Sequence, residues 1–404
     1  MRLLRTLTAA LVVGMARLSF ADAAQVICWG AGDGSQSGAP HFGQSAPPPG
    51  LRDTGLIAAG FMHSIAGVES SNETTVVCWG DNRFGQCNVP PMATLTQLIG
   101  IAAGGRHTVV AAYTSEGFRI TCFGDNNWGQ CSPPLTLLDA DGFRMPGRDS
   151  VAAGLDHSVA ITVKPNGDTR VTGWGRNDEG QCAPPGSLLH AVTVSAGGYH
   201  TAAIDDPGFT GTQTQLHLWG DNSRGQCSAP TALSNPASVA CGLSHTLVVS
   251  NVYDGSTRSQ LHAWGDNTWG QCTIPPEILS APLEPRAVAA SGNHSLCLMS
   301  NGQVIAWGRN AFGEASQPPL LNAARSIAGG GYHSMAITNS CPADLDGSEI
   351  ADAGDIGSLL LLWGPCAPEW FGNGVSSCYG DLDQNGDVDS GDLGVLLTSY
   401  GWCP

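Results

Sequence analysis

Residues 79–87 read WGDNRFGQC, a phrase that returns along most of the chain. Residues 123–131 read FGDNNWGQC, and residues 174–182 read WGRNDEGQC. The other copies begin at Trp219, at Trp264, in decayed form at Trp307 (WGRNAFGEA) and most loosely at Trp29 (WGAGDGSQS). Successive copies lie 43 to 51 residues apart. A period of this length is typical of a repeat protein, in which one unit cannot bury its apolar face alone.

A second signature alternates with the first: a glycine within a stretch of small residues, two variable residues and a histidine. Its histidines are His63, His107, His157, His200, His245, His294 and His333. The chain begins on a Trp-Gly unit and ends on a histidine unit, so six repeats are complete. The seventh must combine the strand at His333 with the strand at Trp29, which leaves the ring without an open edge. We therefore predict an all-β fold, a seven-bladed β-propeller closed by its N- and C-terminal strands.

The composition and the turn signals agree with short strands. Glycine and proline supply 54 and 25 of the 404 residues, while 42% of the chain is hydrophobic. An asparagine three residues after six of the seven aromatics favours an Asx turn. The glycines expected at positive φ, three residues further on, are Gly85, Gly129, Gly180, Gly225, Gly270 and Gly313.

Gly-x-x-His followed by Trp-Gly-x-Asn-x-x-Gly-Gln resembles the regulator of chromosome condensation repeat, in the compact bacterial form that adds Cys-x-Pro-Pro. The resemblance covers roughly residues 25 to 340, and we place the propeller at 24–340. It implies blades of four strands. It also implies a protein that binds other proteins across a propeller face, as family members do when they exchange nucleotide on a small GTPase or inhibit secreted hydrolases.

The N-terminus has the three parts of a secretory signal. Arg2 and Arg5 precede an apolar run over residues 7–16, and small residues suited to cleavage occupy positions 21–23. We therefore predict a signal peptide at 1–23 and a secreted or cell-surface bacterial protein. No later segment reaches the roughly 18 apolar residues of a transmembrane helix, so we expect no membrane span.

The net charge of −17 is distributed unevenly. Residues 341–404 carry eleven Asp or Glu and no Lys or Arg, and Lys164 is the sole lysine of the chain. A nucleic-acid-binding protein presents a basic face that releases counterions from the phosphates. The sequence therefore argues against nucleic acid as a partner.

The C-terminal region, 341–404, contains a duplication with a period of 37 residues. The second copy places Asp381, Asp383, Asn385, Asp387, Asp389 and Asp392 at positions 1, 3, 5, 7, 9 and 12 of a loop. With Gly386 at position 6 and a backbone carbonyl from position 7, this is the pattern of a calcium loop. The corresponding residues of the first copy are Asp344, Asp346, Ser348, Ile350, Asp352 and Asp355. Glu349 replaces the turn glycine there, so we expect weaker binding by the first loop.

Aspartate at position 12 and the apolar helix expected over residues 393–400 resemble dockerin modules. The resemblance implies a small α-helical, EF-hand-like domain that binds calcium and docks to a cohesin-like or cell-surface protein. Each copy is bracketed by cysteines 25 residues apart, which suggests the disulfides Cys341–Cys366 and Cys378–Cys403. Such bonds form in an oxidising compartment and stabilise a module too small for a large core.

The cysteines of the propeller leave two interpretations open. Cys78 with Cys87 and Cys122 with Cys131 share a nine-residue spacing that permits pairing. The loop cysteines Cys182, Cys227 and Cys272 have no such partner. A free cysteine is also tolerated as a small buried hydrophobe.

The histidines and tryptophans of the repeat are expected to be structural. Equivalent positions in a seven-bladed ring are about 51° apart on a circle and do not converge on a metal. We therefore expect one buried histidine per blade, bonded to backbone near the Trp-Gly strand, and tryptophans that anchor one blade to the next. Trp128 and Trp269, with Phe84 and Phe312, occupy variable loop positions and are expected to be exposed contact residues.

No nucleophile motif, phosphate loop or metal-ligand pair occurs in the repeats, so we assign no catalytic residue. We expect a monomeric, non-enzymatic interaction scaffold whose propeller recognises protein and whose tail docks in a calcium-dependent manner. The alternative is a secreted polysaccharide-active enzyme, which would need acidic residues from different blades to converge on the propeller face.

Overall fold

The computed structural model describes most of the repeat region and short pieces of the C-terminal region. The described residues are 25–35, 37–49, 51, 54–69, 74–92, 94–137, 150–164, 168–206, 213–231, 233–253, 257–279, 283–318, 321, 324–338, 350–351, 353–361, 364–365, 387–388, 390–391, 393, 396 and 401–402. The expected signal peptide lies outside them. Across this part of the chain, no helix has the length and apolar character that crossing a bilayer requires.

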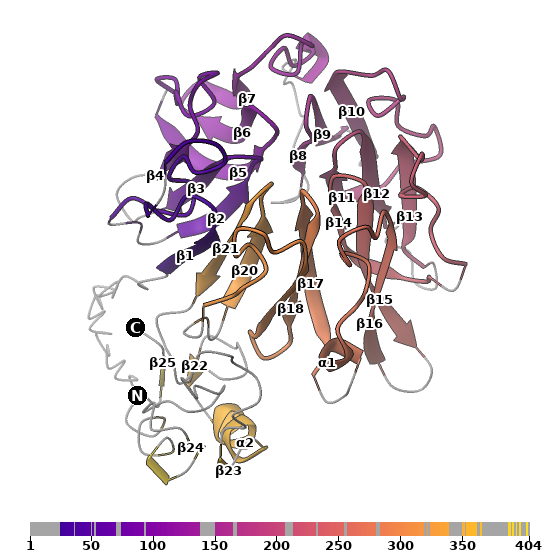
Figure 1. Cartoon of the computed structure of the whole chain (residues 1–404). Coiled ribbons are helices and arrows are strands. Elements are labelled where there is room, and N and C mark those ends of the chain that lie inside the picture. The colour runs from indigo at the N-terminus through magenta and orange to yellow at the C-terminus, as the bar shows by residue number, and fades with distance from the viewer. Residues whose placement is uncertain are drawn as a thin grey trace, which may run out of the picture.

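Seven antiparallel sheets, each of three strands within the described residues, are arranged around a common axis as the blades of a propeller (Figure 1). Blades 1 to 3 are β2 (Thr54–Ala59), β3 (His63–Glu69) and β4 (Thr74–Gly80); β5 (Leu95–Ala103), β6 (His107–Thr114) and β7 (Gly117–Gly124); and β8 (Val151–Ala153), β9 (His157–Val163) and β10 (Thr169–Gly175). Blades 4 to 6 are β11 (Ala191–Ala196), β12 (His200–Asp205) and β13 (Gln215–Gly220); β14 (Pro236–Cys241), β15 (His245–Tyr253) and β16 (Thr257–Gly265); and β17 (Pro285–Ser291), β18 (His294–Met299) and β19 (Val304–Gly308). Blade 7 is β20 (Ala324–Gly329), β21 (His333–Thr338) and β1 (Gln25–Gly30), and two short helical turns, η1 (Leu135–Leu137) and α1 (Pro276–Leu279), lie in loops.

Blade 7 closes the ring from both ends of the repeat region. Strand β1 pairs antiparallel with β21, with Gln25 opposite Thr338 and Gly30 opposite His333. The predicted closure is therefore confirmed, and the blade that contains it lies between blades 6 and 1 (Figure 1). Because the first and last strands share one sheet, separating the blades requires breaking this pairing.

The core lies between blades rather than within one of them. Middle strands such as β12, β18 and β21 are buried along their whole length, in agreement with the apolar residues that follow His-Ser or His-Thr in each of them. In one cluster, Val109 and Ala111 of β6 pack with Ala160 of β9 and Trp174 of β10. The tryptophan of one blade thus packs on the middle strand of the blade before it, as predicted.

The expected fourth strand is absent from the blades over the described residues, and the chain after Trp-Gly shows why. In blade 1, Gly80 has φ +102°, so the backbone leaves the sheet immediately after β4. Turn hydrogen bonds follow, from Gly85 N to Asn82 O (3.1 Å) and from Asn88 N to Gly85 O (3.0 Å). Backbone groups satisfied in local turns are not available for a sheet ladder.

The C-terminal region forms a second, twofold arrangement of short elements. These are β22 (Ile350–Ala351), α2 (Ala353–Leu361), β23 (Gly364–Pro365), β24 (Asp387–Val388) and β25 (Gly401–Trp402). Strand β22 pairs with β25 and β24 pairs with β23, so the start of each copy pairs with the end of the other. Leu359 and Leu396, which are 37 residues apart, are both fully buried. The duplication seen in the sequence is therefore a structural duplication.

The residues of the predicted calcium loops fall almost entirely outside the described part of the chain. Asp344, Asp346, Ser348, Asp352, Asp381, Asp383, Asn385, Asp389 and Asp392, and the cysteines Cys341, Cys366, Cys378 and Cys403, lie outside the described residues. Of the remaining predicted ligands, Ile350 is in β22, Asp387 is in β24 and Asp355 is in α2. Calcium binding, both tail disulfides and the dockerin-like character stay predictions.

Candidate functional site

Two kinds of loop meet at the same end of every blade. In blade 1, His63 is paired with Gly80, so the turn before β3 and the loop after β4 are neighbours. The N–H of Asp81 donates to the carbonyl of Met62 across them (2.9 Å). The same bond is made in all seven blades, by the N–H of Ala31, Asp81, Asp125, Arg176, Asp221, Asp266 and Arg309. We call this end of the propeller the loop face.

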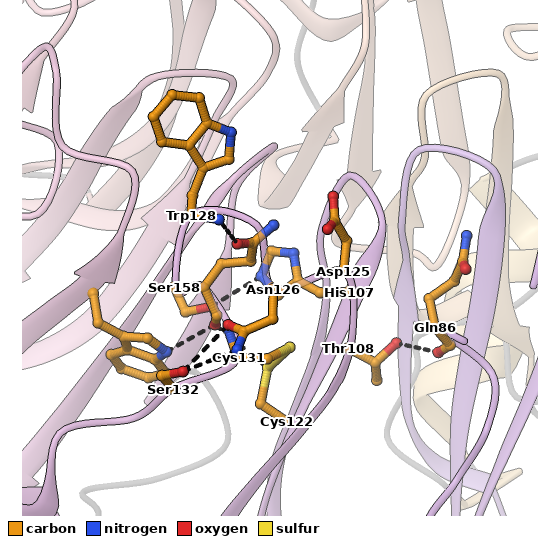
Figure 2. The surroundings of a disulfide bond; sticks show 12 residues. Gln86, His107, Thr108, Cys122, Asp125, Asn126, Trp128, Cys131, Ser132 and Ser158 are labelled. Carbon is orange, nitrogen blue, oxygen red and sulfur yellow. Dashed lines mark hydrogen bonds between the residues drawn. A yellow bond between two sulfur atoms is a disulfide. The ribbon is translucent and has the colours of Figure 1, made fainter. Parts of the chain in front are cut away.

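A closed ring of histidine–hydroxyl contacts lies beneath the loop face. His107 Nε2 of blade 2 is 2.9 Å from Ser158 Oγ of blade 3, and the same contact joins every blade to the next (Figure 2). The pairs are His63–Thr108, His107–Ser158, His157–Thr201, His200–Thr246, His245–Ser295, His294–Ser334 and His333–Ser64, at 2.8 to 3.1 Å. All fourteen side chains are fully buried. We call them the histidine ring.

The hydroxyls determine which histidine nitrogen carries the proton. Thr108 Oγ1 donates to the carbonyl of Gln86 (2.8 Å), as its counterpart does in each blade, so it can only accept from His63 Nε2 (Figure 2). His63 Nδ1 is then unprotonated, and it faces the backbone of Gly60 without a hydrogen-bond partner. Burial lowers the pKa of this histidine to about 4 and that of His107 to about 3. The ring is neutral and structural.

The expected backbone partner of these histidines is therefore corrected. The direct partner is the Ser or Thr that follows the histidine of the next blade, and that hydroxyl relays the bond to backbone. The same carbonyl also accepts the indole N–H of the blade's tryptophan, as Gln130 O does from Trp174 (2.8 Å). In blade 2, Phe123 replaces the tryptophan and leaves this second bond unmade.

Side-chain hydrogen bonds hold each loop in one shape above the ring. Asn126 Oδ1 accepts the N–H of Cys131 (2.8 Å), and Gln130 Oε1 accepts the N–H of Trp128 (2.9 Å). The glycines expected at positive φ have values from +79° to +82°. Both propeller disulfides are present: Cys78–Cys87 and Cys122–Cys131 have Cα atoms 5.0 and 4.9 Å apart.

The loops present aromatic side chains at variable positions. Trp128 and Trp269 are 49% and 53% exposed, and Phe84 is 39% exposed. Trp128 projects away from the disulfide and the histidine ring (Figure 2). Phe312 was expected to be exposed as well, but it lies half-buried because its ring packs edge-on against His41 and Tyr332, each 5.6 Å away.

Arginines stack on these rings, a feature that the sequence reasoning missed. The guanidinium of Arg83 lies 4.3 Å from the Phe42 ring, and that of Arg106 lies 4.5 Å from Phe84. Arg176 is 4.7 Å from both Trp128 and Tyr199. Arg309 is 4.7 Å from Tyr332, 5.1 Å from Phe312 and 5.8 Å from Trp269. The available signal was Arg176 and Arg309 in place of the aspartate of the WGDN phrase.

Carboxylates complete the charge pattern of the loop face. Arg176 Nε donates to Asp178 Oδ2 (2.8 Å), and its Nη1 is 3.6 Å from Asp156 Oδ2. Burial raises the pKa of Asp156, an effect that the positive charge of Arg176 opposes. Arg309 Nε is 3.8 Å from Oε1 of Glu314, which is fully buried.

An axial channel of about 390 Å³ is lined by the first strand of each blade, mostly by small residues. It narrows toward the loop face, where Phe61, Leu155 and Leu243 approach the axis. The intervening blades have Gly105 and Gly198 at the equivalent positions, and a Cβ on Gly105 would lie 2.5 Å from the carbonyl of Leu155. Bulky residues and glycines therefore alternate around the narrow end of the channel in blades 1 to 5.

Among the described residues, no three His, Cys, Asp or Glu side chains are grouped so that they could hold a metal ion. What the loop face offers instead is exposed aromatic surface, stacked guanidinium groups and carboxylates on rigid loops. Trp, Tyr and Arg are the residue types that contribute most to protein–protein binding.

The comparisons with known proteins support this fold. The regulator of chromosome condensation (RCC1) repeat family matches residues 286–314. Human WBSCR16 has a TM-score of 0.57 at 17% identity, covering 79% of this chain and 99% of its own. The crystal structure of Kap60 bound to yeast RCC1 (Prp20) has a TM-score of 0.54 at 17% identity, covering 80% and 90%. No curated protein matches the sequence. The repeat region is therefore an RCC1-like propeller.

Proposed function

We propose that this chain is a secreted, non-enzymatic interaction protein whose loop face recognises another protein. One observation supports this most: exposed Trp128 and Trp269 and the stacked arginines sit together on one face. They are held by loops whose backbone groups are already satisfied. A preorganised surface of this kind loses little conformational entropy on binding.

The solved relative in yeast is consistent with a binding role, since its structure contains RCC1 (Prp20) with a bound protein, Kap60. The two propeller disulfides support folding in an oxidising compartment, in agreement with the signal peptide expected at 1–23. RCC1-like propellers supply a rigid scaffold, and their function lies in what the loops present.

The C-terminal region is the docking half of the proposal. Its reciprocal strand pairs bring Ile350 and Asp387, position 7 of each predicted calcium loop, into short two-stranded sheets. Each of these sheets joins positions 7 and 8 of one predicted loop to the end of the other copy, which suits two copies that act as one unit. We propose that these loops bind calcium and that the calcium-bound module binds a cohesin-like or cell-surface protein.

Recognition by the loop face is tested by panning a phage-displayed library of random 16-residue peptides on the full chain. Peptides that the native chain enriches should be lost on the triple variant Phe84→Ser/Trp128→Ser/Trp269→Ser. They should be retained on Leu189→Ser, which removes a 46%-exposed side chain that precedes β11, at the opposite end of the blade. Failure to enrich any peptide, or equal retention by the triple variant, would refute loop-face recognition.

The calcium proposal is tested by titrating the full chain with calcium in a calorimeter. Asp381→Ala/Asp383→Ala should abolish the stronger binding event, whereas the matched variant Asp344→Ala/Asp346→Ala should remove only a weaker one. Unchanged calcium uptake in both variants would show that these loops do not bind the ion.

A further inference from the structure

The two clusters of aromatic rings around Arg176 and Arg309 are built in the same way. In each, the arginine follows Trp-Gly of one blade and contacts the exposed tryptophan in the loop of the preceding blade. It also contacts the tyrosine that precedes the histidine of the following blade. The first triad is Trp128, Arg176 and Tyr199, and the second is Trp269, Arg309 and Tyr332.

Each triad position holds its tryptophan, arginine or tyrosine in two of the seven repeats and a different residue in the other five. The position five residues after the repeat aromatic holds tryptophan only in blades 2 and 5, and the position after Trp-Gly holds arginine only in blades 3 and 6. The position before the histidine holds tyrosine only in blades 4 and 7. Three departures from the repeat therefore recur together, three blades apart, which corresponds to a rotation of about 154° around the axis.

Each arginine pairs with a carboxylate of its own loop, Asp178 or Glu314, and also reaches rings that belong to two other blades. In blades 1, 2, 4 and 5 the aspartate at this position accepts a hydrogen bond within its loop, as Asp221 Oδ1 does from the N–H of Ser223 (2.8 Å). Arginine has no acceptor, so the loops of blades 3 and 6 give up this bond, which contributes about 1 kcal/mol. What the exchange adds in both places is contact with an exposed tryptophan and a tyrosine of the two neighbouring blades, which makes each triad a larger rigid surface.

The two triads differ in charge. The first has Asp156 and Asp178 within 4 Å of Arg176, and the exposed Glu179 adjoins them. Asp125 and Arg106 also act on Asp156, so carboxylates outnumber guanidinium groups and the surroundings are acidic. At the positions of Asp156 and Asp178, blade 6 has Asn293 and Ala311. Around Arg309 lie instead Phe312 and, in edge-on contact with Tyr332, Phe61. Since the buried Glu314 balances Arg309, the second triad is neutral and apolar.

We propose that the two triads are paired anchor sites for a single protein partner, in which a basic segment contacts the Trp128 triad and an apolar segment contacts the Trp269 triad. This inference rests on the proposed recognition function of the loop face. It adds the chemistry and the polarity of the partner. Even without the acidic residues 341–404, the rest of the chain is net negative, so it attracts a basic partner before contact, and the apolar triad fixes the orientation of that partner.

The test uses the 16-residue peptide library itself as the probe. An extended peptide of this length spans about 50 Å, enough to cross a propeller face. Enriched peptides are synthesised, and their Kd is measured by fluorescence anisotropy with the native full chain, Trp128→Ala, Trp269→Ala and the control Leu189→Ala. Thermal unfolding of each variant verifies that it is folded.

We expect enriched peptides to be net positive, with basic residues toward one end and apolar residues toward the other. Each tryptophan variant should raise the Kd at least tenfold, and Leu189→Ala should leave it unchanged. Asp178→Asn/Glu179→Gln should weaken basic peptides at least threefold. Raising the salt concentration should weaken binding to the native chain as well.

Three results overturn the pairing but leave the proposed function intact, and the first two concern the enriched peptides themselves. These are enriched peptides that depend on only one tryptophan, and enriched peptides that are acidic. Peptides that are insensitive to both tryptophans but lost on Phe84→Ser overturn it in the same way. If no peptide is enriched, both the pairing and the proposed function fail.

Discussion

Each repeat contributes to two layers that lie only a few residues apart in sequence, the histidine ring and the loop face. The first is uniform across the blades and the second is variable. The histidine ring repeats in all seven blades with contacts of 2.8 to 3.1 Å. The loop face above it differs from blade to blade mainly at the two exposed positions that follow the loop asparagine, such as Asn127 and Trp128 in blade 2. The repeated positions therefore hold the blades together, whereas the variable positions carry the proposed binding function.

Acid should destabilise the histidine ring more than any single substitution does. Burial lowers the pKa of the seven ring histidines to about 3 or 4. In the unfolded chain a histidine binds a proton near pH 6.5, so between these values the unfolded state holds more protons and stability falls as the pH falls. The free energy of unfolding can fall by at most about 1.4 kcal/mol per pH unit for each histidine, or roughly 10 kcal/mol per pH unit for the ring of seven.

Because a native protein is stable by only about 5–15 kcal/mol, we expect a steep acid unfolding transition between about pH 4 and 6. Tryptophan fluorescence during a pH titration measures the midpoint, and potentiometric titration of the native and urea-unfolded chains counts the additional protons. A chain that stays folded at pH 4 with no excess proton uptake on unfolding would contradict the neutral buried ring.

The next effect concerns the glycine that faces each ring histidine. A Cβ on Gly154 would collide with His157 Cε1 and with the carbonyl of Gly197 in the next blade. We expect Gly154→Ala to lower the free energy of unfolding by about 3 kcal/mol or more, because backbone cannot move aside. In urea unfolding, the matched control Gly186→Ala, which meets no atom within 4 Å, should change stability by less than about 1 kcal/mol. Equal effects of the two changes would mean that the ring is loosely packed.

A new disulfide should join the two layers in blade 5. Ala263 stands where blades 1 and 2 have Cys78 and Cys122, and Cys272 stands where they have the partner cysteine. We expect Ala263→Cys to pair with Cys272 and to add about 2–3 kcal/mol under oxidising conditions, through loop-closure entropy. Ala263→Ser is the control. A stability that does not depend on a reductant would show that the bond does not form.

A smaller gain is expected where the repeated layer is incomplete. Phe123→Trp would let an indole N–H donate to the carbonyl of Gln86, which already accepts from Thr108 in the same way as its counterparts. We expect a stabilisation of about 1 kcal/mol, measured by urea unfolding. Phe123→Leu, which adds no donor, should destabilise the chain, and a loss of stability in both variants would argue against the shared-carbonyl design.

Much of the repeated layer was predictable, because seven copies reveal what they share. The blade count, the closure of β1 on β21 and the positive φ of Gly85 followed from spacing alone. The sequence also shows Ser or Thr after all seven histidines. That each hydroxyl bonds the histidine of the preceding blade could not be predicted, because the contact joins two blades. The prediction of a fourth strand was wrong over the described residues. The positive φ of Gly80 turns the chain out of the sheet, and the turn at Asn82 then satisfies backbone groups locally.

The loop face was predictable only in part. Exposure of Trp128 and Trp269 followed from their variable loop positions and is confirmed. Their stacking with Arg176 and Arg309 was not foreseen, because each triad draws its members from three blades. Contacts between side chains so far apart in sequence can be predicted only when the order and the rotation of the blades are known.

The most direct test of the two-layer account measures stability and binding in the same variants. Trp128→Ala and Trp269→Ala should each change the free energy of unfolding by less than about 0.5 kcal/mol, because both side chains are half exposed. The double variant should nevertheless lose the binding of loop-face peptides at least a hundredfold in Kd. If instead the double variant unfolds several kcal/mol more easily, or binds as the native chain does, the separation of a structural layer from a recognition layer is wrong.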